Sequence, residues 1–317
     1  MEVAVGAFFA PVADIGLRPA LDIRDRSIGR ADADHPYLRH PTARAVSRCY
    51  GVSMSRTLAE VPIYLDHHAH TPMDVRVHAV LVEAYQQFDV NPHSHSIAGD
   101  RAREAVEQAR ARVAELLGVG PSEIVFTSGA TEANNLAIAG LAPLFLRHGR
   151  HRILVSPLEH PSVLTAADRL ADAFEVERLK VGHDGLIDLV DLEARLATDV
   201  GLVSVGLANH EVGAIQPLYQ ISAMCRSVGA LVHSDLAQAA GKIPLTMDGV
   251  DLASLSAHKI HGPLGIGALM VRRRLRRQIA PLLTGGAQEA GTRAGTVPTP
   301  LCVGRSRQGR PTSGQPA

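Results

Sequence analysis

The sequence predicts an α/β fold with a mostly parallel sheet that is sandwiched by helices. Between residues 124 and 272, short apolar runs typical of strands alternate with longer amphipathic segments typical of helices. A composition of 46% hydrophobic and 20% charged residues is ordinary for a globular protein, which at 317 residues forms one large domain or two modest ones.

Both ends of the chain are expected to lie outside the folded unit. Residues 1–58 mix Arg, Asp, Pro and Gly without a sustained period, which predicts a disordered extension, or upstream sequence if translation starts at Met54. Residues 305–317 are polar, with no core residue, and predict a disordered tail. The expected folded domain therefore covers residues 59–304.

The first ordered elements are expected directly after Pro62. Residues 63–65 predict a short strand, and residues 75–88 predict a helix. A longer amphipathic helix is predicted over residues 101–117, where one face is apolar and Gly118 supplies the terminating residue.

From there the expected elements alternate between strand and helix, which is the pattern of a parallel sheet. The predicted strands cover residues 124–127, 153–155, 176–181, 202–205, 230–233, 252–255 and 267–272. The predicted helices cover residues 131–145, 162–173, 189–196 and 221–228.

Composition argues against several classes of function. The 32 basic and 32 acidic residues cancel, which disfavours a nucleic-acid or anionic-membrane surface. No apolar run approaches the ~18 residues of a membrane span, and residues 1–11 lack the basic start of a signal peptide. Three scattered cysteines form neither a disulfide framework nor a metal-pair spacing. The protein is therefore expected to be soluble and cytoplasmic.

Polar residues follow the predicted strands, where open α/β sheets bind ligands. Small residues at a helix start let backbone N–H groups approach a phosphate, although a simple helix cap is the alternative for residues 127–132. The side chains expected to share this rim are Thr131, His160, Asn209, Asp235, Gln238, Ser256, His258 and Lys259.

Lys259 lies between an apolar run, residues 250–255, and a Gly/Pro-rich loop, residues 262–267. Partial desolvation there would lower its pKa, as a Schiff-base lysine requires, whereas a solvated surface lysine is the alternative. Pyridoxal phosphate uses the whole set of rim residues: a phosphate cradle, a carboxylate for the ring nitrogen, a group stacked on the ring and a lysine.

The chain from about residue 63 to residue 304 resembles the class V aminotransferases of PLP fold type I, and within them the cysteine desulfurases. The matching segments are YLDHHAHTP (64–72), IVFTSGATE (124–132), EH (159–160), NHEVG (209–213), HSDLAQ (233–238), SAHK with GP (256–263), GGAQE (285–289) and RAGT (293–296).

The resemblance implies catalytic and ring-binding roles for particular residues. Lys259 would form the Schiff base and move the Cα proton, Asp235 would pair with the ring nitrogen, and His160 would stack on the ring. Gln238 would hydrogen-bond the ring hydroxyl. His210 stands where the family commonly has Asn, and a neutral imidazole can still donate to the ring oxygen.

The resemblance also implies a phosphate site and a homodimer. The residues that would hold the phosphate are Ala130, Thr131, Ser256 and His258. Thr296 corresponds to a residue that reaches the phosphate of the other subunit, so two chains would share their active sites.

The reaction implied is L-cysteine to L-alanine, with sulfur passed as a persulfide to a sulfur-acceptor or scaffold protein for iron–sulfur cluster assembly or thiolation. The family's mobile cysteine loop and small C-terminal domain have no match, and none of Cys49, Cys225 and Cys302 fits that loop. The expectation is a C-terminally truncated chain with impaired turnover.

Three alternatives stay open. The chain could be another class V enzyme, such as an aminotransferase or a selenocysteine lyase, or a non-catalytic chain that binds the cofactor or only dimerises. A metal site is the third, because histidines cluster in the sequence, but their spacing matches no closed site. Those histidines are His67, His68, His70, His93 and His95.

Overall fold

The computed structural model describes residues 63–303, and the chain divides into two units. One unit includes residues 66–303 and contains all the helices and strands described here. Of the other unit only residues 63–65 are described, and the strand predicted there is wrong. A strand needs a partner to accept its backbone hydrogen bonds, and three apolar residues alone do not supply one. The predicted extension and tail, residues 1–58 and 305–317, lie outside the described residues.

A seven-stranded sheet forms the centre of the unit, in the order β1-β7-β6-β5-β4-β2-β3. Strand β7 is antiparallel to both of its neighbours, and the remaining pairs are parallel. This confirms the predicted mostly parallel sheet. The strands are β1 (Ile124–Thr127), β2 (Arg152–Val155), β3 (Glu175–Arg178), β4 (Val200–Ser204), β5 (Leu231–Asp235), β6 (Leu252–Ser256) and β7 (Gly267–Val271).

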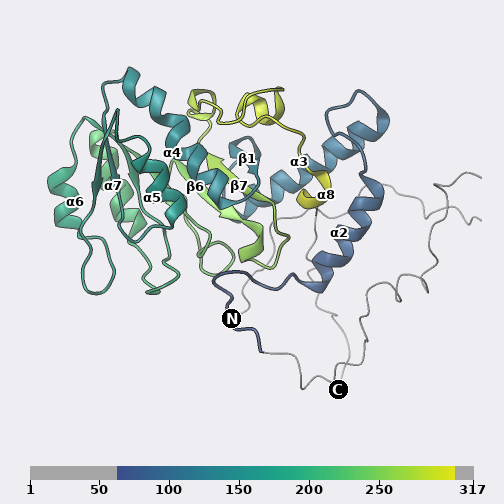
Figure 1. Cartoon of the computed structure of the whole chain (residues 1–317), viewed down its shortest axis with the longest axis horizontal. Helices are drawn as coiled ribbons and strands as arrows, with labels where there is room; N and C mark the ends of the chain where they lie inside the picture. The colour runs from purple at the N-terminus through teal and green to yellow at the C-terminus, as the bar shows by residue number, and fades with distance from the viewer. Residues whose placement is uncertain (1–62, 304–317) are drawn as a thin grey trace, which may run out of the picture. The chain divides into compact units, whose positions relative to one another are not determined.

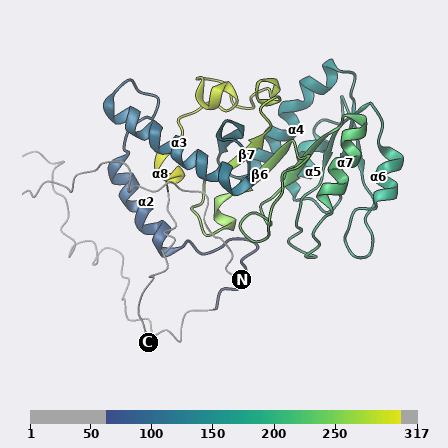
Figure 2. The same ribbon diagram turned by 180° about the vertical axis from the view of Figure 1, so that it is seen from behind.

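Helices cover both faces of the sheet (Figures 1 and 2). Helices α3 (Ile97–Leu117), α6 (Leu189–Arg195) and α7 (Leu218–Val228) pack on one face, and α4 (Ala130–Arg147) and α5 (Pro161–Asp168) on the other. Strand β2 shows why both faces are covered. Leu154 lies in the apolar core beneath α3, α6 and α7, whereas Ile153 and Val155 lie in the core beneath α4 and α5. Successive side chains of a strand point to opposite faces, so an all-apolar strand requires cover on both.

The remaining elements in the described residues are two helices and four 3-10 turns. Helix α2 (Val75–Gln87) and the short α8 (Thr299–Cys302) pack together, and α8 also contacts α3 (Figure 1). The 3-10 turns are η3 (Pro121–Glu123), η4 (Ala257–Lys259), η5 (Arg276–Gln278) and η6 (Gln288–Gly291).

Local chemistry explains where the observed elements differ from the predicted ones. Helix α3 begins four residues earlier than predicted, because the Ser96 hydroxyl accepts the Gly99 N–H and caps the helix. It ends as predicted at Gly118, whose φ of 64° is left-handed. Helix α5 is shorter than predicted, since the chain after Asp168 continues as hydrogen-bonded turns. Within residues 63–303, no helix is long and apolar enough to cross a membrane.

Candidate active site

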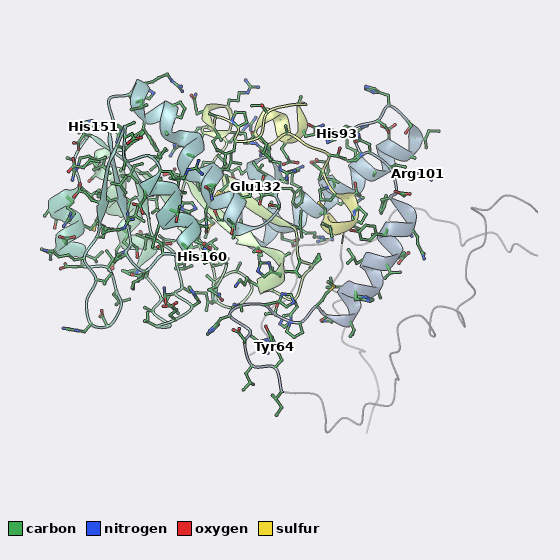
Figure 3. The ribbon with its side chains drawn as sticks, in the orientation of Figure 1. Tyr64, His93, Arg101, Glu132, His151 and His160 are labelled. Atoms are coloured by element: carbon green, nitrogen blue, oxygen red, sulfur yellow. The ribbon has the colours of Figure 1, made fainter. Side chains whose placement is uncertain are left out.

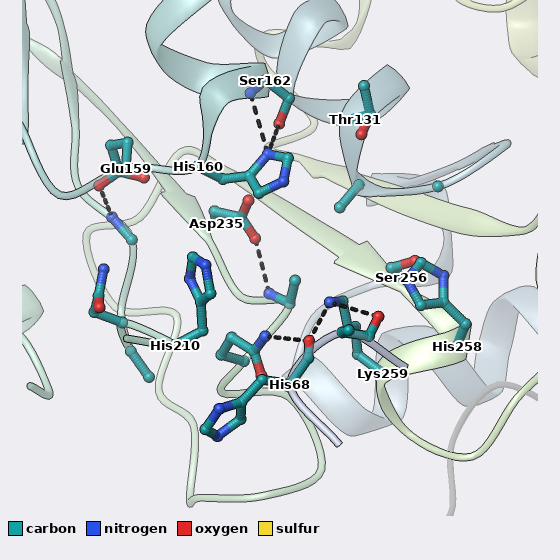
Figure 4. A pocket seen from close by; sticks show the side chains of 18 of the residues that line it. His68, Thr131, Glu159, His160, Ser162, His210, Asp235, Ser256, His258 and Lys259 are labelled. Carbon is teal, nitrogen blue, oxygen red and sulfur yellow. Dashed lines mark hydrogen bonds between the residues drawn. The ribbon is translucent and has the colours of Figure 1, made fainter. Parts of the chain in front are cut away.

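A cavity of about 490 Å³ lies at the carboxyl ends of the parallel strands, and its volume is typical of a small-ligand site. Figure 4 shows it from close by. Of the side chains predicted from the sequence, it brings together Ala130, Thr131, His160, His210, Asp235, Gln238, Ser256, His258 and Lys259. Thr296 is exposed and does not line this cavity.

The N-terminus of α4 forms one wall of the cavity. Free backbone N–H groups and the helix dipole make such a terminus attractive to a phosphate. Strand β7 supports this turn from behind: a Cβ on Gly267 would lie 2.5 Å from the Cα of Gly129. Glu132 accepts the Ser128 N–H at 2.7 Å and pairs with Arg293 at 2.8 Å, which ties the turn to the segment after η6.

Ser256 and His258 line the same cavity, at the end of β6 and in η4. The Ser256 hydroxyl is 2.8 Å from His258 Nδ1. Burial lowers the pKa of His258, and the charges of Lys259 and His70 lower it further. His258 is therefore a neutral hydrogen-bonding group near neutral pH.

Lys259 ends η4, directly after β6. Its ammonium is held by the turn at residues 67–69. Nζ donates to the carbonyl oxygens of His68 and Ala69, the latter at 3.0 Å (Figure 4). Burial lowers the pKa of Lys259, while the charges of Asp235 and Asp66 oppose the shift. The direction is the one that frees an amine for nucleophilic and base chemistry.

Asp235 ends β5 and points into the cavity toward the ring of His160 (Figure 4). Its Oδ1 accepts the Ala237 N–H at 2.8 Å, and its Oδ2 accepts the side-chain N–H of Asn134 at 2.8 Å. Burial lowers the pKa of His160; the charge of Asp235 opposes this shift, and those of His210 and Lys259 add to it.

Gln238 is oriented by two hydrogen bonds. Its Nε2 donates to the His68 carbonyl at 3.0 Å, and its Oε1 accepts from Lys242 Nζ at 2.6 Å. Burial and the charge of Lys259 both lower the pKa of Lys242. The ammonium of Lys242 therefore fixes which end of the Gln238 amide acts as the donor.

His210 lies in the loop after β4, with its ring centroid 6.4 Å from that of His160 and a tilt of 50°. Asn209 shapes this loop. Its Oδ1 accepts the N–H groups of Glu211 and Val212, and its Nδ2 donates to the Leu158 carbonyl at 2.7 Å. The ring of His210 therefore faces the same cavity as the ring of His160.

Glu159 is a cavity residue to which the sequence reasoning assigned no role. Its carboxyl group is buried and accepts the Gly206 N–H at 2.5 Å. Burial raises the pKa of Glu159 to about 8, helped by the charge of Asp235 and opposed by hydrogen bonds from Gly206 and Ser156. An acid in the short loop between the buried strand β2 and His160 was the available signal.

Neither described cysteine lines the cavity. Cys225 is buried on α7 and Cys302 on α8, and burial raises the pKa of Cys225 to about 12 and that of Cys302 further. Cys49 lies outside the described residues.

The histidine cluster forms no metal site in the described part of the chain: residues 63–303 hold no group of three His, Cys, Asp or Glu side chains arranged for a metal ion. His93 lies beside α3, well apart from His160 (Figure 3).

The profile of the family described as Aminotransferase class-V matches residues 63–307. The chain belongs to the class-V aminotransferase family. It is 48% identical over 248 residues to the mitochondrial cysteine desulfurase of Eremothecium gossypii, covering 77% of this chain and 50% of that protein. It is 46% identical to the cysteine desulfurase IscS of Rickettsia rickettsii, covering 77% and 60%. The chain thus spans between half and two thirds of these relatives' lengths.

Solved structures agree with this family. A NifS-like protein aligns with a TM-score of 0.74 and 39% identity, covering 77% of this chain and 68% of that one. A structure described as SspA in complex with cysteine aligns with a TM-score of 0.73 and 38% identity, covering 77% and 71%.

Class-V aminotransferases are pyridoxal-phosphate proteins, and the cavity of this member fits that cofactor. A helix N-terminus stands ready for a phosphate, and a carboxylate, an imidazole and an amine with a lowered pKa line the same space. The solved NifS-like protein superposes on 77% of this chain, which shows that the two share the fold.

Proposed function

We propose that this chain is a pyridoxal-phosphate-dependent cysteine desulfurase, with residues 59–304 as its cofactor-binding domain and L-cysteine as its substrate. The observation that carries the proposal is the convergence of Lys259, Asp235 and His160 on one cavity at the carboxyl edge of the sheet. The structural relative described as a complex with cysteine supports that substrate over others.

The phosphate would be held by the start of α4, through Ala130 and Thr131, and by Ser256 and His258. Lys259 would hold the cofactor covalently. Asp235 would place its negative charge against the ring nitrogen, Gln238 and His210 would contact the ring oxygen, and His160 would cover one face. When bound, the cofactor supplies an electron sink that stabilises negative charge developing on the substrate carbon.

The protein's own groups would then move the protons. The pKa of Lys259 is lowered by burial, so its amine can take a proton from the substrate Cα and return it at neutral pH. The pKa of His160 is also lowered, so its ring is neutral and can form a hydrogen bond with the substrate. Asp235, held by Asn134 and the Ala237 N–H, keeps a fixed orientation throughout.

The sulfur-accepting thiol would come from outside the described residues, because Cys225 and Cys302 are buried away from the cavity. An acceptor thiolate attacks the sulfur, the C–S bond breaks with its electron pair left on carbon, and that carbon gains a proton to give L-alanine. The attacking thiol then carries the sulfur as a persulfide. A sulfur-acceptor or scaffold protein of iron–sulfur cluster assembly or thiolation would receive the sulfur from this persulfide.

Two chains would form a homodimer. The exposed Thr296 would reach the phosphate of the other subunit, in keeping with its place away from its own cavity. Sedimentation of the purified chain with and without the cofactor measures this state directly, and a loaded monomer would contradict the proposed role of Thr296.

The proposal is tested by adding pyridoxal phosphate to the purified chain and recording the visible absorbance of the lysine-linked cofactor. The band is expected in the wild type and in Lys180→Ala, an exposed lysine paired with Asp191, and is expected to vanish in Lys259→Ala. With L-cysteine and dithiothreitol as the acceptor thiol, alanine and sulfide are the expected products, formed at the impaired rate that the sequence leads us to expect. A folded protein that forms no band would refute the proposal.

Selenocysteine lyase activity is the second candidate within the same family, because the cavity residues would serve either substrate. Parallel assays with L-cysteine and L-selenocysteine decide between them. A rate detectable only with L-selenocysteine would replace the cysteine assignment while leaving the cofactor site intact.

A further inference from the structure

Asn134, in the second turn of α4, is fully buried and contacts two groups of the cavity wall. Its Nδ2 donates to Asp235 Oδ2 at 2.8 Å and to Ser162 Oγ at 2.9 Å. Ser162 lies in turn beside His160 at the start of α5 (Figure 4). One amide therefore joins Asp235 and His160, which end or follow different strands.

A backbone N–H group fixes the direction of each hydrogen bond in the series that joins Asn134, Ser162 and His160. His160 is the N-cap of α5, and its Nδ1 accepts the Ser162 N–H at 3.1 Å. An N–H can only donate, so Nδ1 carries no hydrogen, and a neutral ring must carry its hydrogen on Nε2. The Ser162 hydroxyl, 2.8 Å from the same Nδ1, must donate as well.

The orientation of the Asn134 amide follows from the same series of hydrogen bonds. Once the Ser162 hydroxyl gives its hydrogen to His160, its oxygen is an acceptor, and Asp235 Oδ2 is an acceptor too. Only the NH₂ end of the amide can serve both. Within the described residues Asn134 Oδ1 has no hydrogen-bond partner, so the amide sacrifices its acceptor to keep both donor contacts.

We propose that Asn134 is a positioning residue that fixes His160 as the tautomer with its hydrogen on Nε2 and holds Asp235 in place. Cap and amide act together: the Ser162 N–H excludes a hydrogen at Nδ1, and Asn134 commits the Ser162 hydroxyl to donate to the same atom. His160 then presents an N–H donor to the cavity at Nε2. The catalytic consequence rests on the proposed desulfurase function, whereas the tautomer does not.

The charged surroundings of His160 are consistent with a neutral ring. The groups that act on it are Asp235 at the end of β5, His210 in the loop after β4, and Lys259 in η4. The pKa of His160 is lowered, because burial and the charges of His210 and Lys259 together outweigh the charge of Asp235. Protonation would also place a hydrogen on Nδ1, against the Ser162 N–H, so His160 serves as a donor through Nε2 rather than as a base.

The tautomer is measured by ¹⁵N NMR of histidine-labelled, cofactor-free protein near neutral pH. The His160 signals are assigned by their loss in His160→Asn, which retains a capping side chain. The wild type is expected to show hydrogen on Nε2. Ser162→Ala and Asn134→Leu are each expected to lower the ratio of the two tautomers by about three- to tenfold. Ser162→Ala removes the hydroxyl that donates to Nδ1, and Asn134→Leu removes the donor that commits this hydroxyl to His160.

The matched control is Asn135→Leu, the next residue on the same helix, whose Nδ2 donates to the Thr131 carbonyl instead. It is expected to keep the wild-type ratio. Hydrogen on Nδ1 in the wild type, or an unchanged ratio in Ser162→Ala or in folded Asn134→Leu, overturns the proposal. If Asn134→Leu loses its circular-dichroism signal, Asn134→Ala replaces it in the same measurement.

The cofactor-loaded protein separates this inference from the proposed function. If the wild type binds no cofactor, the proposed function fails and the NMR result still stands. If it turns over cysteine, Asn134→Leu is expected to lower kcat by about tenfold or more with a smaller change in KM, because orientation matters most in the transition state. Equal effects of Asn134→Leu and Asn135→Leu on kcat would contradict the positioning role.

Discussion

The carboxylate of Glu289 accepts hydrogen bonds from both terminal nitrogens of Arg110, each at 2.7 Å, in the interior of the protein. The side chain of Glu289 is 1% exposed and that of Arg110 is 9% exposed. The Glu289 carboxylate also accepts the Phe126 N–H at 3.0 Å. Glu289 and Ala290 both have left-handed backbones, with φ of 51° and 55°. The ion pair thus fastens a strained turn of η6 to α3 and β1.

Glu289→Gln is expected to destabilise the fold by about 3–5 kcal/mol, because it removes the buried counter-charge of the Arg110 guanidinium and leaves only the exposed Glu107 beside it. Urea denaturation followed by circular dichroism measures the change. Glu115→Gln is the control, since Glu115 pairs with Arg112 on the exposed side of the same helix. Comparable losses in the two variants would show that burial of the Arg110–Glu289 pair is not what matters.

Glu159 is expected to make the stability fall as pH rises. Its pKa is raised to about 8 in the fold against 4.5 in the unfolded chain, so between these values only the folded state retains the proton. The free energy of unfolding then decreases with pH, by at most about 1.4 kcal/mol per unit from this group. The effect is absent below pH 4.5 and complete above pH 8.

Denaturation curves from pH 5 to pH 8 test this prediction. Glu159→Gln is expected to lose this part of the slope and to gain stability relative to the wild type as the pH rises. Glu193→Gln, an exposed change on α6, is expected to follow the wild-type curve. Parallel curves for wild type and Glu159→Gln would mean that the carboxyl group ionises normally inside the fold.

Gly267→Ala is expected to disrupt the proposed phosphate site at the start of α4. A Cβ at this position would lie 2.5 Å from both the Cα of Gly129 and the Leu255 carbonyl, and neither backbone can move aside as a side chain would. A loss of 1–3 kcal/mol or more in stability, roughly the range for overpacking, should accompany weaker binding of pyridoxal phosphate. Melting temperature and cofactor titration measure the two effects.

Gly120→Ala is the matched control for that change. Gly120 has an ordinary φ of −78°, and a Cβ there would meet no atom closer than 3.9 Å. It should behave as the wild type in both measurements. Normal cofactor affinity in Gly267→Ala would argue that the proposed phosphate site does not depend on the close approach of β7.

The buried thiols are expected to be unreactive in the native protein. With Cys49→Ser removing the cysteine outside the described residues, an aromatic disulfide reagent at pH 8 should find no fast thiol until guanidinium unfolds the chain. Burial raises the pKa of Cys225 to about 12 and that of Cys302 further, so neither forms appreciable thiolate at that pH. A rapidly reacting native thiol would locate a sulfur acceptor within the described part.

Much of the fold was predictable because periodicity reports burial. The run Ile153–Val155 reads as a strand covered on both faces, and each of its side chains lies in one of the two cores. The strand predicted at residues 63–65 is wrong although it is also a run of three apolar residues, because it lies outside the alternating series of strands and helices that predicts neighbouring strands to pair with. Helix α3 was predicted to start late because a serine cap is a hydrogen bond, which hydropathy does not register.

The site was predictable only as far as strand ends and motifs could carry it. Asp235 ends β5 and Lys259 follows β6, so their convergence in one cavity followed from the topology. Asn134 was missed because its position within α4 gives no sign of its two acceptors, which lie far along the chain. The protonation of Glu159 depends on burial in the assembled fold, which no short stretch of sequence encodes.

The capping of α5 by His160 means that a single nitrogen, Nδ1, both anchors a helix and sets the chemistry of a ring facing the cavity. Alanine scanning at this position would therefore merge two losses into one number. His160→Asn separates them, because an asparagine can cap the helix without supplying an imidazole. The start of α5 is thus a place where improving thermal stability and altering reactivity are not independent engineering choices.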